Sequence, residues 1–248
     1  MEYKDLKVED VIFVPSVQHT GTWFVLKFLE RFGYKPAPAI NFFNGAIARI
    51  EERSALQVHL PVANHLDMVV HPDPFEVRNG DVASPLSLNS IIVLSKIFKT
   101  FMPVRDPLAA ILTREARHPE LRHFYIVDGF IHMAKYLSGN SNVMFLPIDL
   151  MDKPSQRQEL LIRILKHCGV HINKEVHNIV NEVAAVWEPV NDTPNNKFRE
   201  AYKEGNKGKI MFDIGAKTAE VEYLKNSASI ILPFMKSLGY TKADLDLW

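Results

Sequence analysis

Cysteine is almost missing from this sequence of 248 residues, which has a single one at Cys168. One thiol excludes an internal disulfide and fits a reducing compartment. The surrounding sequence, ILKHCGV, is largely apolar, so we expect this thiol to be buried rather than reactive. The common zinc-ligand spacings are missing as well, and the sequence therefore predicts no metal cofactor.

A net charge is also lacking, because 29 basic side chains balance 29 acidic ones. No overall field would draw the chain to nucleic acid or to anionic lipid, so any anion site has to be local. No apolar run approaches the roughly 20 residues needed to span a membrane. The first residues, MEYKDLKVED, lack the apolar core of a secretory signal. We therefore expect a cytoplasmic protein without a nucleic-acid partner.

What is present is a strand, a polar loop and a helix within residues 11–24, VIFVPSVQHTGTWF. The apolar run Val11–Val14 is typical of a strand buried on both faces, and Pro15 is expected to end it. Thr20, Gly21 and Thr22 lie where a helix begins, since apolar residues then recur at helical spacing, at Trp23, Leu26, Leu29 and Phe32. Free backbone N–H groups and the helix dipole favour a phosphate or sulfate there, and Gly21 permits its close approach.

Further strands and helices alternate along the chain. Short apolar runs predict strands over 56–60, 100–104 and 143–147, and helical patterns occupy 86–98, 156–168 and 216–238. KPAPAI, after Tyr34, predicts a turn, and Pro233 is expected to interrupt the last helix. This order predicts an α/β, three-layer sandwich with a central, mostly parallel sheet. Without an internal repeat, residues 1–248 are expected to form a single domain.

Two segments have the composition of loops. Residues 61–86 are rich in Pro, Asp, Asn and Gly, which predicts a long loop that is either a lid, a binding loop or an insertion without a role. Residues 187–210 are polar and basic, which is typical of a mobile segment that orders on a ligand, or of a plain surface loop.

Ligands of parallel sheets bind beyond the carboxyl ends of the strands. Both Pro15–Thr22 and Arg105–Thr113 begin at that edge, so the order of elements can bring them together. Asp106 and Pro107 have the residue types of an N-cap and a first helical residue. We therefore expect two anion-holding segments to face each other.

Several stretches resemble, in their order, the sulfotransferases that use 3′-phosphoadenosine 5′-phosphosulfate (PAPS). HTGTW, residues 19–23, is similar to the PKSGTTW loop of that family. VRDP, residues 104–107, resembles its arginine at a strand end, and the hydroxyl residue expected eight positions later is Thr113. VHLP, residues 58–61, is similar to THLP, whose histidine is the catalytic base. VMFLPIDL resembles a strand and acidic segment, and KEGNKGKIMF loosely resembles a basic loop that would contribute Lys203 and Lys207.

The resemblance implies a P-loop-like fold and transfer of a sulfuryl group from PAPS to a hydroxyl or amine acceptor, leaving 3′-phosphoadenosine 5′-phosphate (PAP). The loop residues Thr20 to Trp23 would hold the 5′-phosphate end, and Arg105 with Thr113 would hold the 3′-phosphate. His59 would be the base. His71 is its rival, because it too could end a strand beside the site, and His65 comes third.

His19 departs from the family, which has lysine or arginine at this position. Two roles follow, because a histidine with an ordinary pKa of about 6.5 is only partly charged at neutral pH. Protonated His19 replaces the lysine as stabiliser and general acid, or the protein binds the nucleotide without efficient turnover.

Two other functions stay open. A P-loop nucleotide kinase shares the strand, loop and helix, although GxxxxGK[ST] is lacking. The alternative is a nucleotide-binding or interaction domain that is not an enzyme. A carbohydrate, a lipid headgroup, a phenol or a small metabolite would all fit as acceptor, and the chain is expected to be a monomer or a homodimer.

Overall fold

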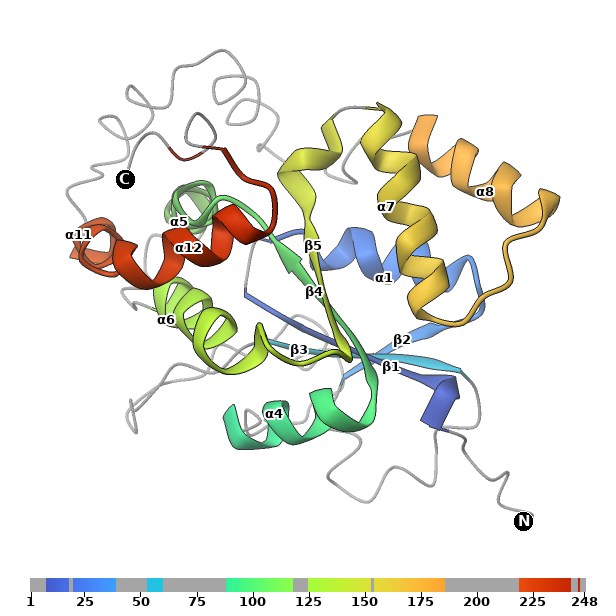
Figure 1. Ribbon diagram of the computed structural model, residues 1–248, viewed down its shortest axis with the longest axis horizontal. Coiled ribbons are helices and arrows are strands. Elements are labelled where there is room, and N and C mark those ends of the chain that lie inside the picture. The colour runs from blue at the N-terminus through green and yellow to red at the C-terminus, as the bar shows by residue number, and fades with distance from the viewer. Residues whose placement is uncertain are drawn as a thin grey trace.

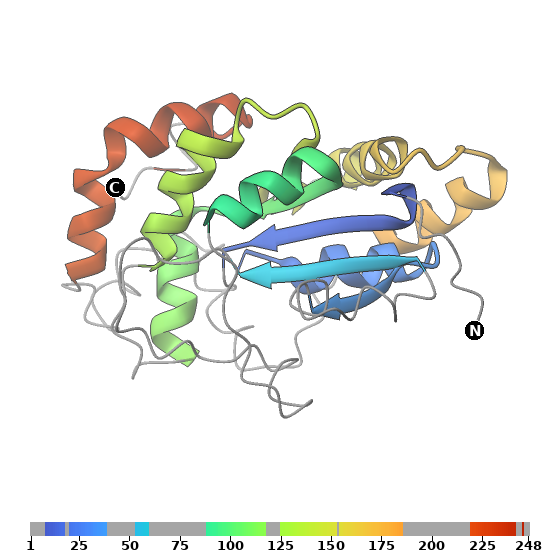
Figure 2. The same cartoon turned by 90° about the horizontal axis from the view of Figure 1, so that it is seen from below.

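The structure, a computed structural model, describes residues 8–17, 20–38, 53–59, 88–117, 125–152, 154–185, 219–241 and 245. Five strands form one sheet in the order β2-β3-β1-β4-β5, and each neighbouring pair is parallel. They are β1 (Val11–Ser16), β2 (Lys35–Pro38), β3 (Ser54–His59), β4 (Lys99–Val104) and β5 (Val143–Pro147). Helices cover both faces of the sheet (Figures 1 and 2), which confirms the predicted α/β architecture.

Side chains of β1 alternate between two hydrophobic cores, one on each face. Val11 and Phe13 belong to the first core, whereas Ile12 and Val14 belong to the second. A strand that is buried on both faces has no polar side, which is why residues 11–14 are all apolar. β1 is therefore the central element that both helical layers cover.

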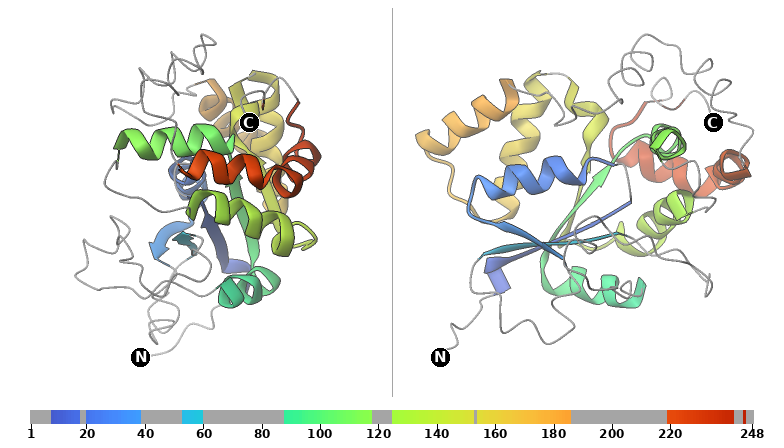
Figure 3. Two further views of the ribbon diagram at one scale, coloured as in Figure 1. Left: turned by 90° about the vertical axis from the view of Figure 1, so that its left-hand side faces the viewer. Right: turned by 180° about the vertical axis from the view of Figure 1, so that it is seen from behind.

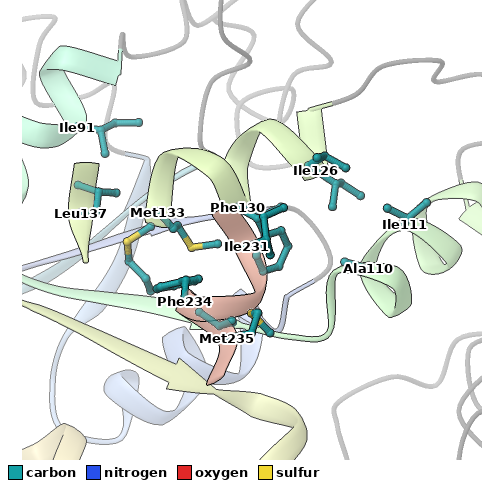
Figure 4. Close-up of a cluster of buried hydrophobic side chains, with 14 of the residues drawn as sticks. Ile91, Ala110, Ile111, Ile126, Phe130, Met133, Leu137, Ile231, Phe234 and Met235 are labelled. Carbon is teal, nitrogen blue, oxygen red and sulfur yellow. The ribbon is translucent and has the colours of Figure 1, made fainter. Parts of the chain in front are cut away.

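The first core is covered by helices that lie between residues 88 and 237 (Figure 4). These are α4 (Leu88–Ile97), α5 (Pro107–Arg117), α6 (Tyr125–His132), the π-helical turn η3 (Met133–Leu137), α11 (Ala219–Asn226) and α12 (Ala228–Ser237). The second core is covered by α1 (Thr22–Glu30), α7 (Pro154–His167) and α8 (Lys174–Ala185). Figure 3 (right) shows α1 and α4 on opposite sides of the sheet. Short 3-10 turns η1 (Val8–Asp10) and η4 (Ile148–Asp152) complete the described elements.

The helix that follows β1 has the predicted pattern of faces. Leu26 and Leu29 of α1 are fully buried in the second core. Lys27 and Glu30, on the other side, form an exposed ion pair of 2.7 Å. The strand and the helix expected within residues 11–24 are therefore present.

Three local predictions that were based on prolines are wrong. Pro15 does not end β1, which continues to Ser16. KPAPAI was expected to turn but contributes β2, whose position at the edge of the sheet tolerates residues without an N–H group. Pro233 lies inside α12, and the interruption of the C-terminal helix falls at Ser227 instead.

β1 and β4 separate toward their carboxyl ends. β1 is in register with β3 along six residue pairs up to Ser16, but with β4 only at Ile12 and Phe13. The chain order also changes here, because β2 and β3 lie on one side of β1 and β4 and β5 on the other. Such a switch point leaves a crevice outside the strand ends, where ligands of open α/β sheets bind. The fold thus directs attention to the segments after β1 and β4.

The predicted loops over 61–86 and 187–210 lie outside the described residues. In the described part of the chain, no helix is long and apolar enough to cross a membrane.

Candidate functional site

The segment after β1 turns sharply into α1. Gly21 has a φ of 97°, in the left-handed region that glycine adopts without strain, and it is the N-cap of α1. Because glycine offers no side-chain cap, the N–H groups of the first turn lack that partner. These groups, at the positive end of the helix dipole, form a suitable site for a phosphate or sulfate oxygen.

The hydroxyl groups of this loop hold the loop itself. Thr20 is fully buried and its Oγ1 donates to the carbonyl oxygen of Val17 at 2.6 Å. Thr22 Oγ1 donates to Ser16 Oγ at 2.7 Å. Because both hydroxyl hydrogens are committed inside the protein, the donors that the described part of this loop offers to an anion are its backbone N–H groups.

Two glycines allow the loop to lie against neighbouring elements. A Cβ on Gly21 would lie 3.2 Å from both Cγ atoms of Ile148, at the start of η4. A Cβ on Gly129, in α6, would lie only 2.5 Å from Val17 Cγ2. Val17 and Gly21, on either side of the loop, are thus clamped against α6 and η4, which fixes the positions of these two residues.

Arg105 follows the last residue of β4 and lies in the predicted pair with Thr113. Its Nη1 donates to Thr113 Oγ1 at 3.2 Å, and Thr113 Oγ1 donates in turn to the carbonyl oxygen of Ala109 at 2.7 Å. The Arg105 side chain is 16% exposed, so it is held in the protein yet reachable from solvent. A guanidinium that keeps N–H groups without a partner among the described residues, beside a hydroxyl oxygen, is a typical partner of a phosphate.

Asp149, in η4, contacts the other edge of the guanidinium. Arg105 Nε and Asp149 Oδ1 are 3.4 Å apart, and the backbone N–H of Asp106 donates to Asp149 Oδ2 at 2.5 Å. Tyr240, beyond α12, places its hydroxyl 3.2 Å from Asp149 Oδ2 and 3.2 Å from the carbonyl oxygen of Val104. Arg105 is therefore held from two sides before any ligand binds.

Asp106 has the role that its sequence position predicts. Its Oδ1 accepts a hydrogen bond of 3.0 Å from the backbone N–H of Leu108, as an N-cap does, and Pro107 is the first residue of α5. The cap sets the direction of α5, and with it the position of Thr113, two turns along the helix.

Burial is the main cause of the pKa shifts of Asp149 and Tyr240. It raises the pKa of the Asp149 carboxyl, and the Arg105 guanidinium opposes this only in part. Burial and the neighbouring Asp149 raise the pKa of Tyr240 well above its ordinary value. The Tyr240 hydroxyl therefore stays protonated at neutral pH and can donate.

Known proteins give little further guidance. No family model matches the sequence, and no curated protein matches it. Among solved structures, mouse sulfotransferase SULT7A1 complexed with PAP shares 19% identity with this chain at a TM-score of 0.45. The match covers 73% of this chain and 65% of the mouse chain, which is less than two thirds of that protein. A likeness of this extent carries no weight for activity, which has to be argued from the site.

The structure describes only part of the predicted site. His59 is the last residue of β3, in register with Ser16, so its backbone lies at the same sheet edge as the loop. Its side chain, like that of Trp23, is not described. The remaining predicted residues, His19, His71, Lys203 and Lys207, lie outside the described residues. Among the residues that are described, no group of three or more His, Cys, Asp or Glu is placed to hold a metal ion.

Sequence reasoning missed the residues that support the site. Asp149 is the acidic residue of VMFLPIDL, so its place after a strand was a signal, but its contact with Arg105 was not foreseen. Tyr240 carries no local signal, since it reaches Val104 from 136 residues away.

Proposed function

We propose that this protein is a sulfotransferase that moves a sulfuryl group from PAPS to a hydroxyl or amine acceptor. The observation that carries this proposal is the 3.2 Å contact between Arg105 Nη1 and Thr113 Oγ1 at the carboxyl end of β4. It forms a phosphate-binding pair at a switch point of the sheet, next to a second anion site at the start of α1. PAPS has two phosphate groups at separate ends, and so requires two such sites.

The donors at the two sites differ in a way that suits the two ends of the nucleotide. Arg105 and Thr113 would hold the 3′-phosphate, because a guanidinium fork matches the geometry of a terminal phosphate. Backbone N–H groups of Gly21 and Thr22 would hold the 5′ end, where charge gathers as the sulfuryl group leaves. Rigid N–H groups stabilise such charge without reorganising, and the clamp formed by Ile148 and Gly129 keeps them rigid.

His59 is proposed as the base that takes the proton of the acceptor. In the transfer, a bond forms between the acceptor oxygen and sulfur while the bond from sulfur to the bridging phosphate oxygen breaks. The end of β3 lies beside the end of β1, since His59 is in register with Ser16, so a base at this position is near the loop. His71 is the alternative base, and protonated His19 is proposed to stabilise the departing phosphate.

A second function, nucleotide binding without turnover, is supported by a different observation. The hydroxyl hydrogens of Thr20 and Thr22 are directed into the protein, and the residue expected as lysine is His19. Such a loop binds an anion but stabilises less of the charge that develops during transfer. Lysine is likewise lacking from the loop for the kinase alternative, which would require ATP and magnesium.

Calorimetric titration tests the nucleotide site without knowledge of the acceptor. We expect the wild-type protein to bind PAP more tightly than adenosine 5′-phosphate, which lacks the 3′-phosphate. Arg105→Ala should lose that preference, whereas Arg31→Ala should keep it, because Arg31 is an exposed residue paired with Glu182 far along the chain. Equal affinity of the wild-type protein for both nucleotides would overturn the proposal.

Transfer itself is tested by mass spectrometry with isotopically labelled PAPS and a panel of phenols, sugars and lipid headgroups. A labelled product, formed without added metal and lost in His59→Ala while PAP still binds, supports the enzyme. Saturable binding with no product from any acceptor favours the second function.

A further inference from the structure

Tyr240 reaches the end of β4 from the C-terminal part of the chain. It follows α12, is buried, and belongs to the first hydrophobic core. Its hydroxyl has two acceptors at 3.2 Å, the carbonyl oxygen of Val104 and Asp149 Oδ2. Val104 is the residue directly before Arg105, so the hydroxyl contacts both the backbone and the carboxylate that flank the arginine.

The Asp149 carboxylate divides its two oxygens between these partners. Oδ1 faces Arg105 Nε, while Oδ2 accepts from the Asp106 N–H and the Tyr240 hydroxyl. Oδ2 accepts hydrogen bonds from Asp106, which follows β4, and from Tyr240, which follows α12. The carboxylate therefore cannot rotate away without breaking both bonds. Oδ1 is thereby kept in place against the guanidinium.

This arrangement leaves the outer edge of the guanidinium available. An arginine has five N–H donors, one on Nε and two on each terminal nitrogen. Within the described part of the chain, Arg105 donates through Nη1 to Thr113 and places Nε in an ion pair with Asp149. The other N–H groups, the second one on Nη1 and the two on Nη2, are the donors that remain for a ligand. An arginine loses rotamer entropy when it is fixed, so fixing it in advance favours ligand binding.

We propose that Tyr240, through Asp149, is a positioning residue that sets Arg105 for recognition of the 3′-phosphate. This inference rests on the proposed function, and it assigns to the segment after α12 a part in choosing the nucleotide. Neither residue touches the ligand in this scheme. Tyr240 acts through the carboxylate, and the carboxylate acts through Arg105.

Tyr240→Phe is the clean test because it removes one hydroxyl and changes no charge. A single hydrogen bond of this kind corresponds to a factor of roughly 2 to 10 in binding. We expect Tyr240→Phe to reduce the preference for PAP over adenosine 5′-phosphate by this factor, while the affinity for adenosine 5′-phosphate stays unchanged. Tyr223→Phe is the matched control, since it removes a hydroxyl that donates to Asp128 at 2.8 Å and does not contact Arg105.

Asp149→Asn distinguishes a role in positioning Arg105 from simple repulsion of the anionic ligand. If Asp149 only repelled the ligand, its neutralisation would strengthen PAP binding. If it positions Arg105, the same change weakens the preference for the 3′-phosphate, because an amide has one acceptor oxygen and cannot serve both Arg105 Nε and the Asp106 N–H. Thermal unfolding of each variant shows whether it is folded.

The outcomes distinguish this inference from the function on which it rests. No preference for PAP in the wild-type protein contradicts the proposed function itself. A wild-type preference that Arg105→Ala abolishes but Tyr240→Phe and Asp149→Asn retain overturns the positioning role alone. Equal weakening toward both nucleotides in Tyr240→Phe also overturns it, since that result indicates general disruption of the site.

Discussion

One methyl group added at Gly129 tests whether α6 clamps the candidate anion loop. The Cβ of Gly129→Ala would lie 2.5 Å from Val17 Cγ2, closer than carbon atoms approach in real proteins. Val17 is buried, and as a β-branched residue it has little rotamer freedom to move aside. The contact therefore has to be relieved by a shift of α6 or of the segment after β1.

Two effects of opposite sign set the change in unfolding free energy that we expect for Gly129→Ala. Alanine in a helix interior is favoured over glycine by about 1 kcal/mol. Overpacking in a well-packed core costs about 1–3 kcal/mol. The net expectation is a loss of up to about 2 kcal/mol, which lowers Tm by roughly 4–8 °C in a protein of this size.

Circular dichroism during thermal unfolding measures the Tm, and calorimetric titration with PAP measures the affinity of the loop for the nucleotide. We expect PAP affinity to fall along with Tm, because Val17 provides the carbonyl oxygen that holds the Thr20 hydroxyl. Gly139→Ala is the control, since a Cβ there meets nothing within 4 Å and should leave both quantities unchanged. In a Val17→Ala background, Gly129→Ala should cost less than it does alone. A Gly129→Ala protein that is more stable than the wild type, with unchanged PAP affinity, would refute the clamp.

Three further predictions concern titratable groups. Burial raises the pKa of Cys168 to about 12, so iodoacetamide at pH 8 should alkylate the folded protein far more slowly than the urea-unfolded chain, and equal rates would contradict this. Burial lowers the pKa of His167, so its contribution to stability is present above about pH 6.5 and is lost as the pH falls through the lower folded value. His167→Gln should flatten the decline of unfolding free energy below that pH, and an unchanged decline would contradict the lowered pKa. The pKa of Asp149 is raised by burial, so its contribution to stability is present below about pH 3.9 and is lost as the pH rises through the folded value. Asp149→Asn should therefore be as stable as the wild type or more stable at pH 7, with a smaller difference near pH 3, and a large loss of stability at pH 7 would show that the ion pair with Arg105 outweighs burial.

The Asp149 prediction also separates stability from recognition. A variant that gains stability yet loses preference for the 3′-phosphate shows that the half-buried Asp149 carboxylate is held in the protein for the ligand. Buried ion pairs often contribute little to stability, because removing two charges from water costs about as much as their attraction returns.

Much of the fold follows from local patterns in the sequence. An unbroken apolar run predicted β1, and helical spacing predicted the buried and exposed faces of α1. Asp106 and Pro107 marked the start of α5 because capping depends only on a few neighbouring atoms. Predictions based on prolines were wrong where the tertiary context tolerates them. Pro36 lies in β2, at the edge of the sheet, and Pro233 lies inside α12.

The candidate site divides in the same way. The loop with Gly21 and the spacing from Arg105 to Thr113 could be found from the sequence, since each lies within one strand–helix connection. Asp149 and Tyr240 could not, because they approach the Arg105 segment from 43 and 136 residues away. Such contacts exist only after the order β2-β3-β1-β4-β5 has set which strand ends are neighbours. The sequence by itself determined which residues can hold an anion. Only the tertiary structure decided what holds those residues, because packing across the sheet brings together atoms that no local pattern links.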